Sequence, residues 1–170
     1  MIDVIPSAVF PDVRLYVPEV FLDGRGYFKE TFSRRKYAAL GMQDDWVQDS
    51  VSHSRRNVIR GMHIDDRMAK LVQALKGTIY DVVVDARENS PTFRRWEAFT
   101  LSDGNHHQLY VPAGFAHGFL AQSDEVIVMY KVSAHYDPAF ERGMRWNDPA
   151  VGIDWPLDGE PILSAKDAAL

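Results

Sequence analysis

The sequence predicts an all-β domain, a sandwich or barrel of short strands. Segments rich in β-branched and aromatic residues recur along the chain, turn residues separate them, and helical periodicity is scarce. Short strands at this spacing are typical of packed antiparallel sheets. No repeat or linker-like stretch interrupts the 170 residues, so we expect a single domain over residues 1–170.

The elements follow in order from local signals. Residues 33–40 are the best helix candidate, because they begin with a serine at the cap position and are followed by Gly41. Gly77 precedes the first clear strand, Pro112 ends the third, and residues 123–124 separate the last two. The strands are predicted at residues 78–86, 95–101, 107–111, 116–122 and 125–133.

The strand at 78–86 carries an acid among apolar residues. Alternation places Tyr80 and Val82 on one face and Ile79, Asp81 and Val83 on the other. Burying a carboxylate without a partner is costly. On pattern alone, the simplest interpretation is that the face bearing Asp81 is solvated.

Composition excludes several classes of function. Nineteen basic against twenty-four acidic residues give a net charge of −5, which argues against a general nucleic-acid binder. The absence of cysteine excludes disulfides, thiolate metal sites and thiol nucleophiles. The N-terminus does not resemble a signal peptide, and no apolar run approaches the ~18–20 residues of a membrane span. We therefore expect a soluble, cytoplasmic protein without a membrane partner.

Two histidines could carry chemistry, although a lone histidine in a strand is more often a hydrogen-bonded structural residue. His117 lies in a P-x-G-x-x-H pattern similar to the second motif of the cupin superfamily, and His63 with Asp65 partly resembles the first. Together they could supply three ligands to zinc, iron or manganese. The second histidine and the glutamate of metal cupins are missing, however, so we do not expect a metal.

Three further residues have ordinary structural interpretations. Lys70 begins an apolar strand and could be a solvated lysine at a strand edge. Tyr130 shares a face with Val126 and Val128, as a core tyrosine would. Arg25 lies in a turn and could be a surface cation. Pattern alone supports an all-β domain, with which a polar cavity is compatible.

Longer segments, taken together, resemble the dTDP-4-dehydrorhamnose 3,5-epimerase family of sugar-nucleotide enzymes. They include DGRGYFKETF at 23–32, VIRGMH at 58–63, QLYVPAGFAHGFL at 108–120, ERGMRWNDPAVGIDWPL at 141–157 and LSAKDAA at 163–169. The resemblance implies a cupin-like jelly-roll sandwich and a homodimer whose subunits share strands. It also implies that the enzyme uses no metal and no organic cofactor.

The implied reaction inverts C3 and C5 of a nucleotide-linked 4-keto-6-deoxy sugar, most simply dTDP-4-dehydro-6-deoxy-D-glucose. Each carbon neighbours the C4 carbonyl, so loss of its proton gives an enolate. The resemblance assigns His63 as the base, oriented by Asp167, and Lys70 as the cation that stabilises the enolate. Tyr130 would return a proton from the opposite side.

The resemblance also implies a set of substrate-binding positions, in which arginines would suit a diphosphate. These positions are Arg25, Phe28, Glu30, Gln48, Ser50, Arg60, Asp81, His117, Tyr136, Glu141 and Lys166. We expect His63, Lys70, Asp81, His117 and Tyr130 to point into one cavity.

Several positions depart from the family pattern. The loop between His63 and Lys70 is short, Asp65 replaces a glutamine, and Ser50 and Val51 stand where asparagine and histidine are usual. These changes leave open the sugar and the number of inverted centres. The alternatives are a single-centre 3- or 5-epimerase for another nucleotide sugar, a metal-dependent cupin enzyme, and a non-catalytic sugar-nucleotide-binding cupin.

Strict alternation raises one conflict within the predicted site. It places Arg60 and His63 on opposite faces of their strand. Either the strand bends near Gly61, or the two residues act in different parts of the pocket.

Overall fold

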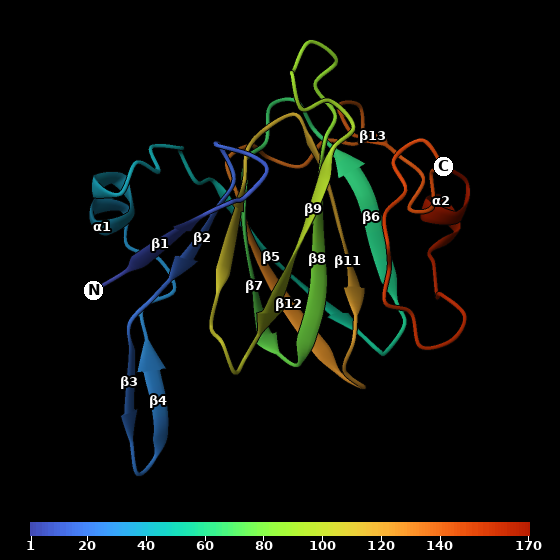
Figure 1. Cartoon of the computed structure of the whole chain (residues 1–170). Helices are drawn as coiled ribbons and strands as arrows, with labels where there is room; N and C mark the ends of the chain where they lie inside the picture. The colour runs from blue at the N-terminus through green and yellow to red at the C-terminus, as the bar shows by residue number, and fades with distance from the viewer.

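In the computed structural model, which describes residues 1–170, two antiparallel sheets pack face to face (Figure 1). The six-stranded sheet has the order β1 (Asp3–Pro6), β2 (Arg14–Val17), β10 (Gln108–Val111), β7 (Lys70–Lys76), β12 (Val126–Val132), β5 (Gln48–Ser54). The five-stranded sheet has the order β13 (Arg142–Gly143), β6 (Ile59–Ile64), β11 (Phe115–Ala121), β8 (Thr78–Asp85), β9 (Trp96–Ser102). The predicted all-β sandwich is confirmed.

The remaining elements are short. Helix α1 (Arg34–Ala39) lies where the sequence predicts a helix, with Ser33 as its N-cap residue. Helix α2 (Ala165–Ala168) has only four residues, too few for periodicity to reveal. Neither helix is long or apolar enough to cross a membrane. The five predicted strands appear as β8 to β12 with ends shifted by one residue at most.

The space between the sheets is filled from both sides. Ile79 and Val83 of β8 face Val72 of β7 and Val128 of β12 in a cluster of fifteen buried residues. On the far side of β8, Val82 packs in a second cluster under the C-terminal segment. Both faces of β8 are therefore buried.

The expectation that the Asp81 face is solvated is consequently wrong. Asp81 and Asp85 are both fully buried, because their face of β8 is the one turned toward the other sheet. Each carboxylate has a hydrogen-bonded partner that offsets its desolvation: the buried His117 bonds to Asp81, and the half-buried Arg87 bonds to Asp85.

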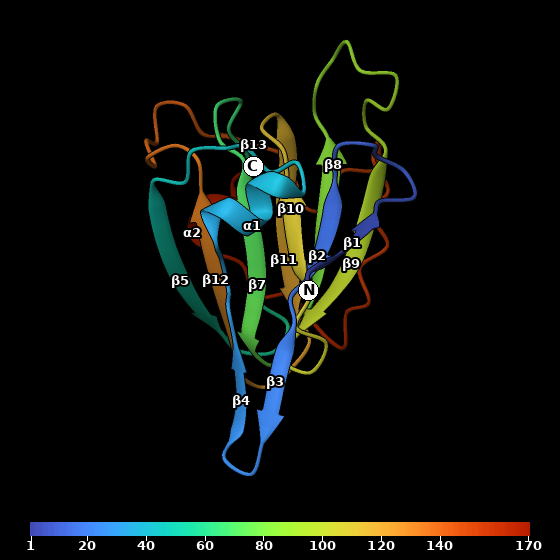
Figure 2. The ribbon, with the colours of Figure 1, turned by 90° about the vertical axis from the view of Figure 1, so that its left-hand side faces the viewer.

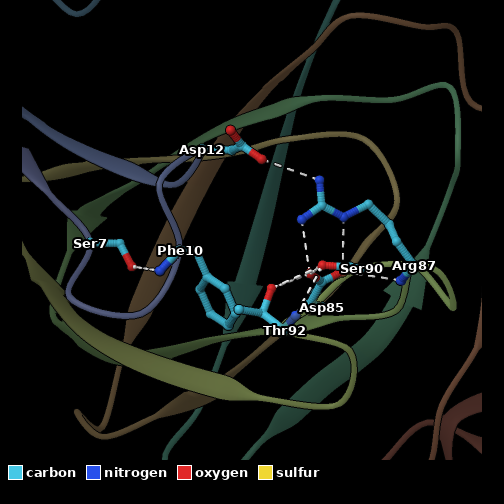
Figure 3. A network of polar contacts seen from close by, with 7 residues as sticks. All are labelled: Ser7, Phe10, Asp12, Asp85, Arg87, Ser90 and Thr92. Atoms are coloured by element: carbon cyan, nitrogen blue, oxygen red, sulfur yellow. Dashed lines mark hydrogen bonds and ion pairs between the residues drawn. The ribbon is translucent and has the colours of Figure 1, made fainter.

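Asp85 organises a polar network at the end of β8 (Figure 3). Arg87 donates to both of its oxygens at 2.8 Å, and Ser90 and Thr92 donate at 2.5 and 2.6 Å. Arg87 also reaches Asp12 at 3.2 Å, which ties the N-terminal loop to this end of the sandwich. Burial by itself would raise the pKa of Asp85, but these hydrogen bonds lower it well below its ordinary value.

A two-stranded hairpin, β3 (Val20–Asp23) and β4 (Gly26–Lys29), projects away from the sandwich (Figures 1 and 2). Its apolar side chains are open to solvent, with Phe21 52%, Leu22 80% and Phe28 67% exposed. An exposed apolar patch of this kind is typical of an interaction surface.

Candidate active site

A cavity of about 450 Å³ opens between the two sheets. The six-stranded sheet supplies one wall through β5, β7 and β12, and the five-stranded sheet supplies the other through β6 and β11. The C-terminal segment closes part of the rim. The predicted site residues that line the cavity are Gln48, Ser50, Arg60, His63, Lys70, His117, Tyr130, Tyr136, Glu141, Lys166 and Asp167.

A β-bulge resolves the conflict over Arg60 and His63. His63 lies opposite His117 on β11, while Arg60 lies opposite Phe119, so β6 has one extra residue between the two pairs. The extra residue lets Arg60 and His63 both face the cavity. Gly61 adopts a φ of 118°, and a Cβ there would approach the Gly118 Cα to 2.7 Å. Of the two possibilities that the sequence left open, a bend of the strand near Gly61 is therefore the one observed.

His63 and Asp167 form a hydrogen-bonded pair, with 2.6 Å between Nε2 and Oδ1. The Asp167 side chain is 4% exposed, whereas the His63 side chain is 31% exposed toward the cavity. Ser164 caps α2 by accepting the Asp167 backbone N–H at 3.0 Å, which fixes the carboxylate. The His63 Nδ1 atom has no protein partner. This arrangement orients an imidazole that can accept a proton from a ligand.

Lys70 places a cation in the cavity near this histidine. Its Nζ donates to the His63 carbonyl oxygen at 3.4 Å. Burial lowers the pKa of Lys70 to about 8, although Glu141, Asp81 and Asp65 act in the opposite direction. The ammonium group therefore remains mostly charged near neutral pH, where it can stabilise a developing oxyanion.

Tyr130 reaches the cavity from the opposite sheet to His63. Its hydroxyl lies 3.0 Å from the Ser52 Oγ atom. Burial raises the pKa of Tyr130, so the phenol remains protonated near neutral pH. The site thus holds a histidine and a protonated hydroxyl on facing walls, which is the geometry that proton removal and return from two sides requires.

His117 and Asp81 form a second pair, joined at 2.6 Å between Nε2 and Oδ1. His117 lines the cavity, but Asp81 is fully buried behind it and is not part of the lining. This differs from the expectation that Asp81 points into the cavity. The physical reason is its hydrogen bond to His117, which places the carboxylate one layer deeper in the sandwich.

Polar residues at the rim are held in place by neighbours. Arg60 donates from Nε to Ser54 Oγ and from Nη2 to the His53 carbonyl, both at 2.9 Å. Lys166 is paired with Glu141, and this pair raises the pKa of Lys166. The rim therefore presents cations whose positions are already set before a ligand binds.

Besides Asp81, three predicted residues do not line this cavity. Arg25 lies at the tip of the hairpin, 91% exposed and paired with Asp23 at 2.5 Å. Phe28 is exposed on β4, and Glu30 pairs with Lys36 of α1. None of the three lines the cavity of their own chain, because the hairpin projects away from the sandwich (Figure 2).

The structure adds lining residues that sequence reasoning missed. Ser52 continues the alternation of Gln48 and Ser50 along β5, a period of two that would have identified it. Ser164 also lines the cavity, two residues before the predicted Lys166 and Asp167. The metal alternative would need His63, Asp65 and His117 to converge on one point. No group of three or more His, Asp or Glu side chains in the structure is close enough together to bind a metal ion.

Comparison with known proteins gives concordant results. The family model described as dTDP-4-dehydrorhamnose 3,5-epimerase matches residues 7–170. The dTDP-4-dehydrorhamnose 3,5-epimerase of Neisseria gonorrhoeae is 46% identical over 169 residues, which are 98% of this chain but 51% of that protein. This chain thus spans about half the length of that relative. The enzyme of the same name from Salmonella typhimurium is 43% identical over 173 residues, covering 99% of this chain and 94% of its own.

Solved structures agree with the sequence relatives. The dTDP-6-deoxy-D-glucose-3,5-epimerase of Legionella pneumophila, in complex with dTDP-4-keto-L-rhamnose, has a TM-score of 0.96 at 38% identity and covers 99% of this chain and 91% of its own. A 3′-monoepimerase from Streptomyces bikiniensis, in complex with dTDP-quinovose, has a TM-score of 0.90 at 33% identity, with coverages of 96% and 84%. These likenesses confirm the cupin-like jelly-roll fold that the resemblance implied.

Proposed function

This chain belongs to the dTDP-4-dehydrorhamnose 3,5-epimerase family, and from that premise we propose that it converts dTDP-4-dehydro-6-deoxy-D-glucose to dTDP-4-dehydro-L-rhamnose by inversion at C3 and C5. The observation that carries the proposal is the placement of the His63–Asp167 pair and Tyr130 on facing walls of one cavity, with Lys70 beside His63. Residues 1–170 act as a single epimerase domain.

The proposed chemistry begins with removal of a carbon-bound proton. His63 accepts the proton through the ring nitrogen that is not bonded to Asp167, and the electron pair of the C–H bond moves into the C4 carbonyl. The resulting imidazolium is stabilised by the Asp167 carboxylate. The enolate oxygen is stabilised by the ammonium group of Lys70.

Inversion requires that a proton return from the other face of the sugar. Tyr130 donates its phenolic proton to the carbanion carbon, and the C4 carbonyl re-forms. Transfer of the proton from His63 to solvent, and of a solvent proton to Tyr130, restores the enzyme. The same pair of groups serves C3 and C5 in turn, because both carbons share the C4 carbonyl.

The nucleotide diphosphate would lie toward the rim. Arg60 and Lys166 are the cations there, and Gln48 and Tyr136 add polar and aromatic contacts. A guanidinium held by Ser54 and the His53 carbonyl is preorganised for a phosphate oxygen.

We propose further that the enzyme is a homodimer. The exposed apolar side chains of the β3–β4 hairpin need a covering surface, and a second copy of the chain would supply it. In that assembly the hairpin would carry Arg25, Phe28 and Glu30 to the neighbouring subunit's cavity, which explains why they do not line their own.

A single-centre epimerase is the second candidate. It is favoured by the likeness to the 3′-monoepimerase and by Asp65, a lining residue that departs from the family pattern. The two candidates differ in which carbon–hydrogen bonds exchange with solvent and invert.

The test is incubation with dTDP-4-dehydro-6-deoxy-D-glucose in deuterated water, followed by NMR of the sugar. We expect deuterium at C3 and C5 with the wild type, and exchange slowed by at least ~10²-fold in His63→Asn. His53→Asn is the matched control, because His53 also faces a carboxylate, Glu125, at 3.5 Å but lies outside the cavity. Exchange at C3 alone or at C5 alone would favour the single-centre enzyme, and exchange that survives in His63→Asn would contradict the assignment of the base.

A further inference from the structure

The loop between β6 and β7 forms part of the cavity wall. It connects the strand that carries His63 to the strand that carries Lys70, and its residues Asp65 and Met68 line the cavity. A contact to this loop can therefore influence the shape of the cavity.

Arg67, at the outer side of this loop, is held by Asp65. The Arg67 Nε and Nη2 atoms donate to the two Asp65 oxygens at 3.1 and 2.8 Å, and the Arg67 backbone N–H donates at 2.9 Å. The Asp65 side chain is 6% exposed, whereas that of Arg67 is 37% exposed. A two-point contact of this kind fixes the plane of the guanidinium group.

The guanidinium plane covers the ring of Phe140, with 3.7 Å from Cζ to the ring centroid. Phe140 ends a tight turn that begins at Asp137, whose carbonyl accepts the Phe140 N–H at 3.1 Å. Phe140 is 51% exposed and belongs to none of the three hydrophobic clusters. Arg67 therefore provides the contact between the Phe140 side chain and the body of the protein.

A second ion pair joins the same two segments. Arg142 Nη2 donates to both oxygens of Asp66 at 2.8 Å. The two side chains are 54% and 62% exposed, and ion pairs in such positions contribute little to stability. The pairing of β13 with β6 fixes residues 142–143, and of the two side-chain links that remain, Arg67 on Phe140 is the one held by a buried carboxylate, Asp65.

The segment held in this way carries two lining residues, Tyr136 and Glu141. Glu141 lies between Phe140 and Arg142 in sequence and pairs with Lys166, the neighbour of Asp167. Tyr136 is 53% exposed; its backbone N–H donates to Gln48 Oε1 at 3.2 Å, and the direction of its ring depends on the position of the segment. Each side chain that must be ordered when a ligand binds lowers affinity.

We propose that Arg67 is a positioning residue: it holds the 136–143 segment at the mouth of the cavity and thereby sets affinity for the nucleotide sugar. The inference rests on the proposed function, because it takes Tyr136 and Glu141 as contacts to that substrate. It assigns Arg67 no part in proton transfer, since neither His63 nor Tyr130 touches it.

The experiment compares the wild type with Phe140→Ala, which removes the stack but leaves the Asp65–Arg67 pair, and with it the surroundings of Lys70, in place. We expect the Kd for dTDP, measured by calorimetry, and the KM for the nucleotide sugar to rise about tenfold, with kcat changed by less than about twofold. Arg67→Lys keeps the charge beside Asp65 without the planar stack, and we expect it to raise Kd and KM by less than Phe140→Ala does.

Arg56→Ala is the matched control. Arg56 also pairs with an aspartate, Asp124, at 2.8 Å, but it does not line the cavity, so its Kd and KM should equal those of the wild type. Unchanged Kd and KM in Phe140→Ala, or a fall in kcat and melting temperature alone, would overturn the positioning role and leave the proposed function standing. A wild type that does not bind dTDP would overturn both.

Discussion

Lys70 offers the sharpest test of the proposed chemistry, because its charge has opposite effects on folding and on catalysis. Its Nζ lies 3.4 Å from the His63 carbonyl oxygen, and burial lowers its pKa from 10.5 to about 8. Lys70→Met removes the cation and keeps a flexible chain of similar length. Lys70→Arg keeps a charge that does not titrate in the accessible range.

The cost of the buried charge can be worked from this shift. A fall from 10.5 to about 8 corresponds to roughly 3 kcal/mol, at about 1.4 kcal/mol per pKa unit. This destabilisation is complete below pH 8. Between about pH 8 and pH 10.5 the unfolded chain binds more protons than the folded one, so the free energy of unfolding rises with pH. Lys70→Met should lack this rise and be at least as stable as the wild type at neutral pH.

The effect on catalysis has the opposite sign. Loss of one preorganised group at a developing oxyanion typically lowers kcat by ~10²–10³-fold, and we expect this loss in Lys70→Met. In the wild type, kcat/KM should fall as the pH rises through about 8, since the free enzyme then loses the lysine proton. Lys70→Arg should be less active but should not show this alkaline fall.

The assay is the rate of deuterium incorporation, measured as kcat/KM against pH for the three proteins, together with thermal unfolding of the same samples. An alkaline fall at the same pH in Lys70→Arg would show that another group titrates. Exchange in Lys70→Met within about fivefold of the wild type would remove Lys70 from enolate stabilisation.

Three further predictions use other parts of the molecule. Tyr130→Phe should retain deuterium exchange while the rate of inversion falls ~10²–10⁴-fold. Ser52→Ala leaves the phenol in place and should keep exchange and inversion in proportion. An unchanged ratio of inversion to exchange in Tyr130→Phe would contradict its role as the acid. Phe28→Glu should shift light scattering from dimer toward monomer, and an unaltered dimer would count against the hairpin as the interface. Asp85→Asn should lower the free energy of unfolding at pH 7 by about 1–3 kcal/mol because it weakens the hydrogen bonds that this buried carboxylate accepts from Arg87, Ser90 and Thr92, and a melting temperature equal to the wild type would refute this.

Alternation of residue types along single strands was sufficient to predict which face of a strand each side chain occupies. Tyr130 shares its face with Val126 and Val128 in the structure, and β8 divides its side chains between the two faces that its pattern predicted. These features depend only on neighbours in sequence, because successive side chains of a strand point to opposite faces.

The same reasoning failed where distant segments meet. Burial of the Asp81 face depends on the opposite sheet, and burial of the other face depends on the C-terminal segment. The bulge at Gly61 depends on the register with β11, where His117 and Phe119 lie opposite His63 and Arg60. Neither the packing nor the register is encoded in the local period of a strand.

The sequence alone therefore determined the five strands β8 to β12, the faces of their side chains, the excluded classes of chemistry and, through its resemblance to a family, the candidate residues. Tertiary structure decided which of these meet: His63 bonds to Asp167 across 104 residues, and His117 bonds to Asp81 across 36. It also decided that Arg25 lies on a hairpin away from its own cavity, and that Arg67 seats Phe140. The reason is physical: periodicity specifies which way a side chain points, whereas its partner is specified by the packing and register of segments far apart in the chain.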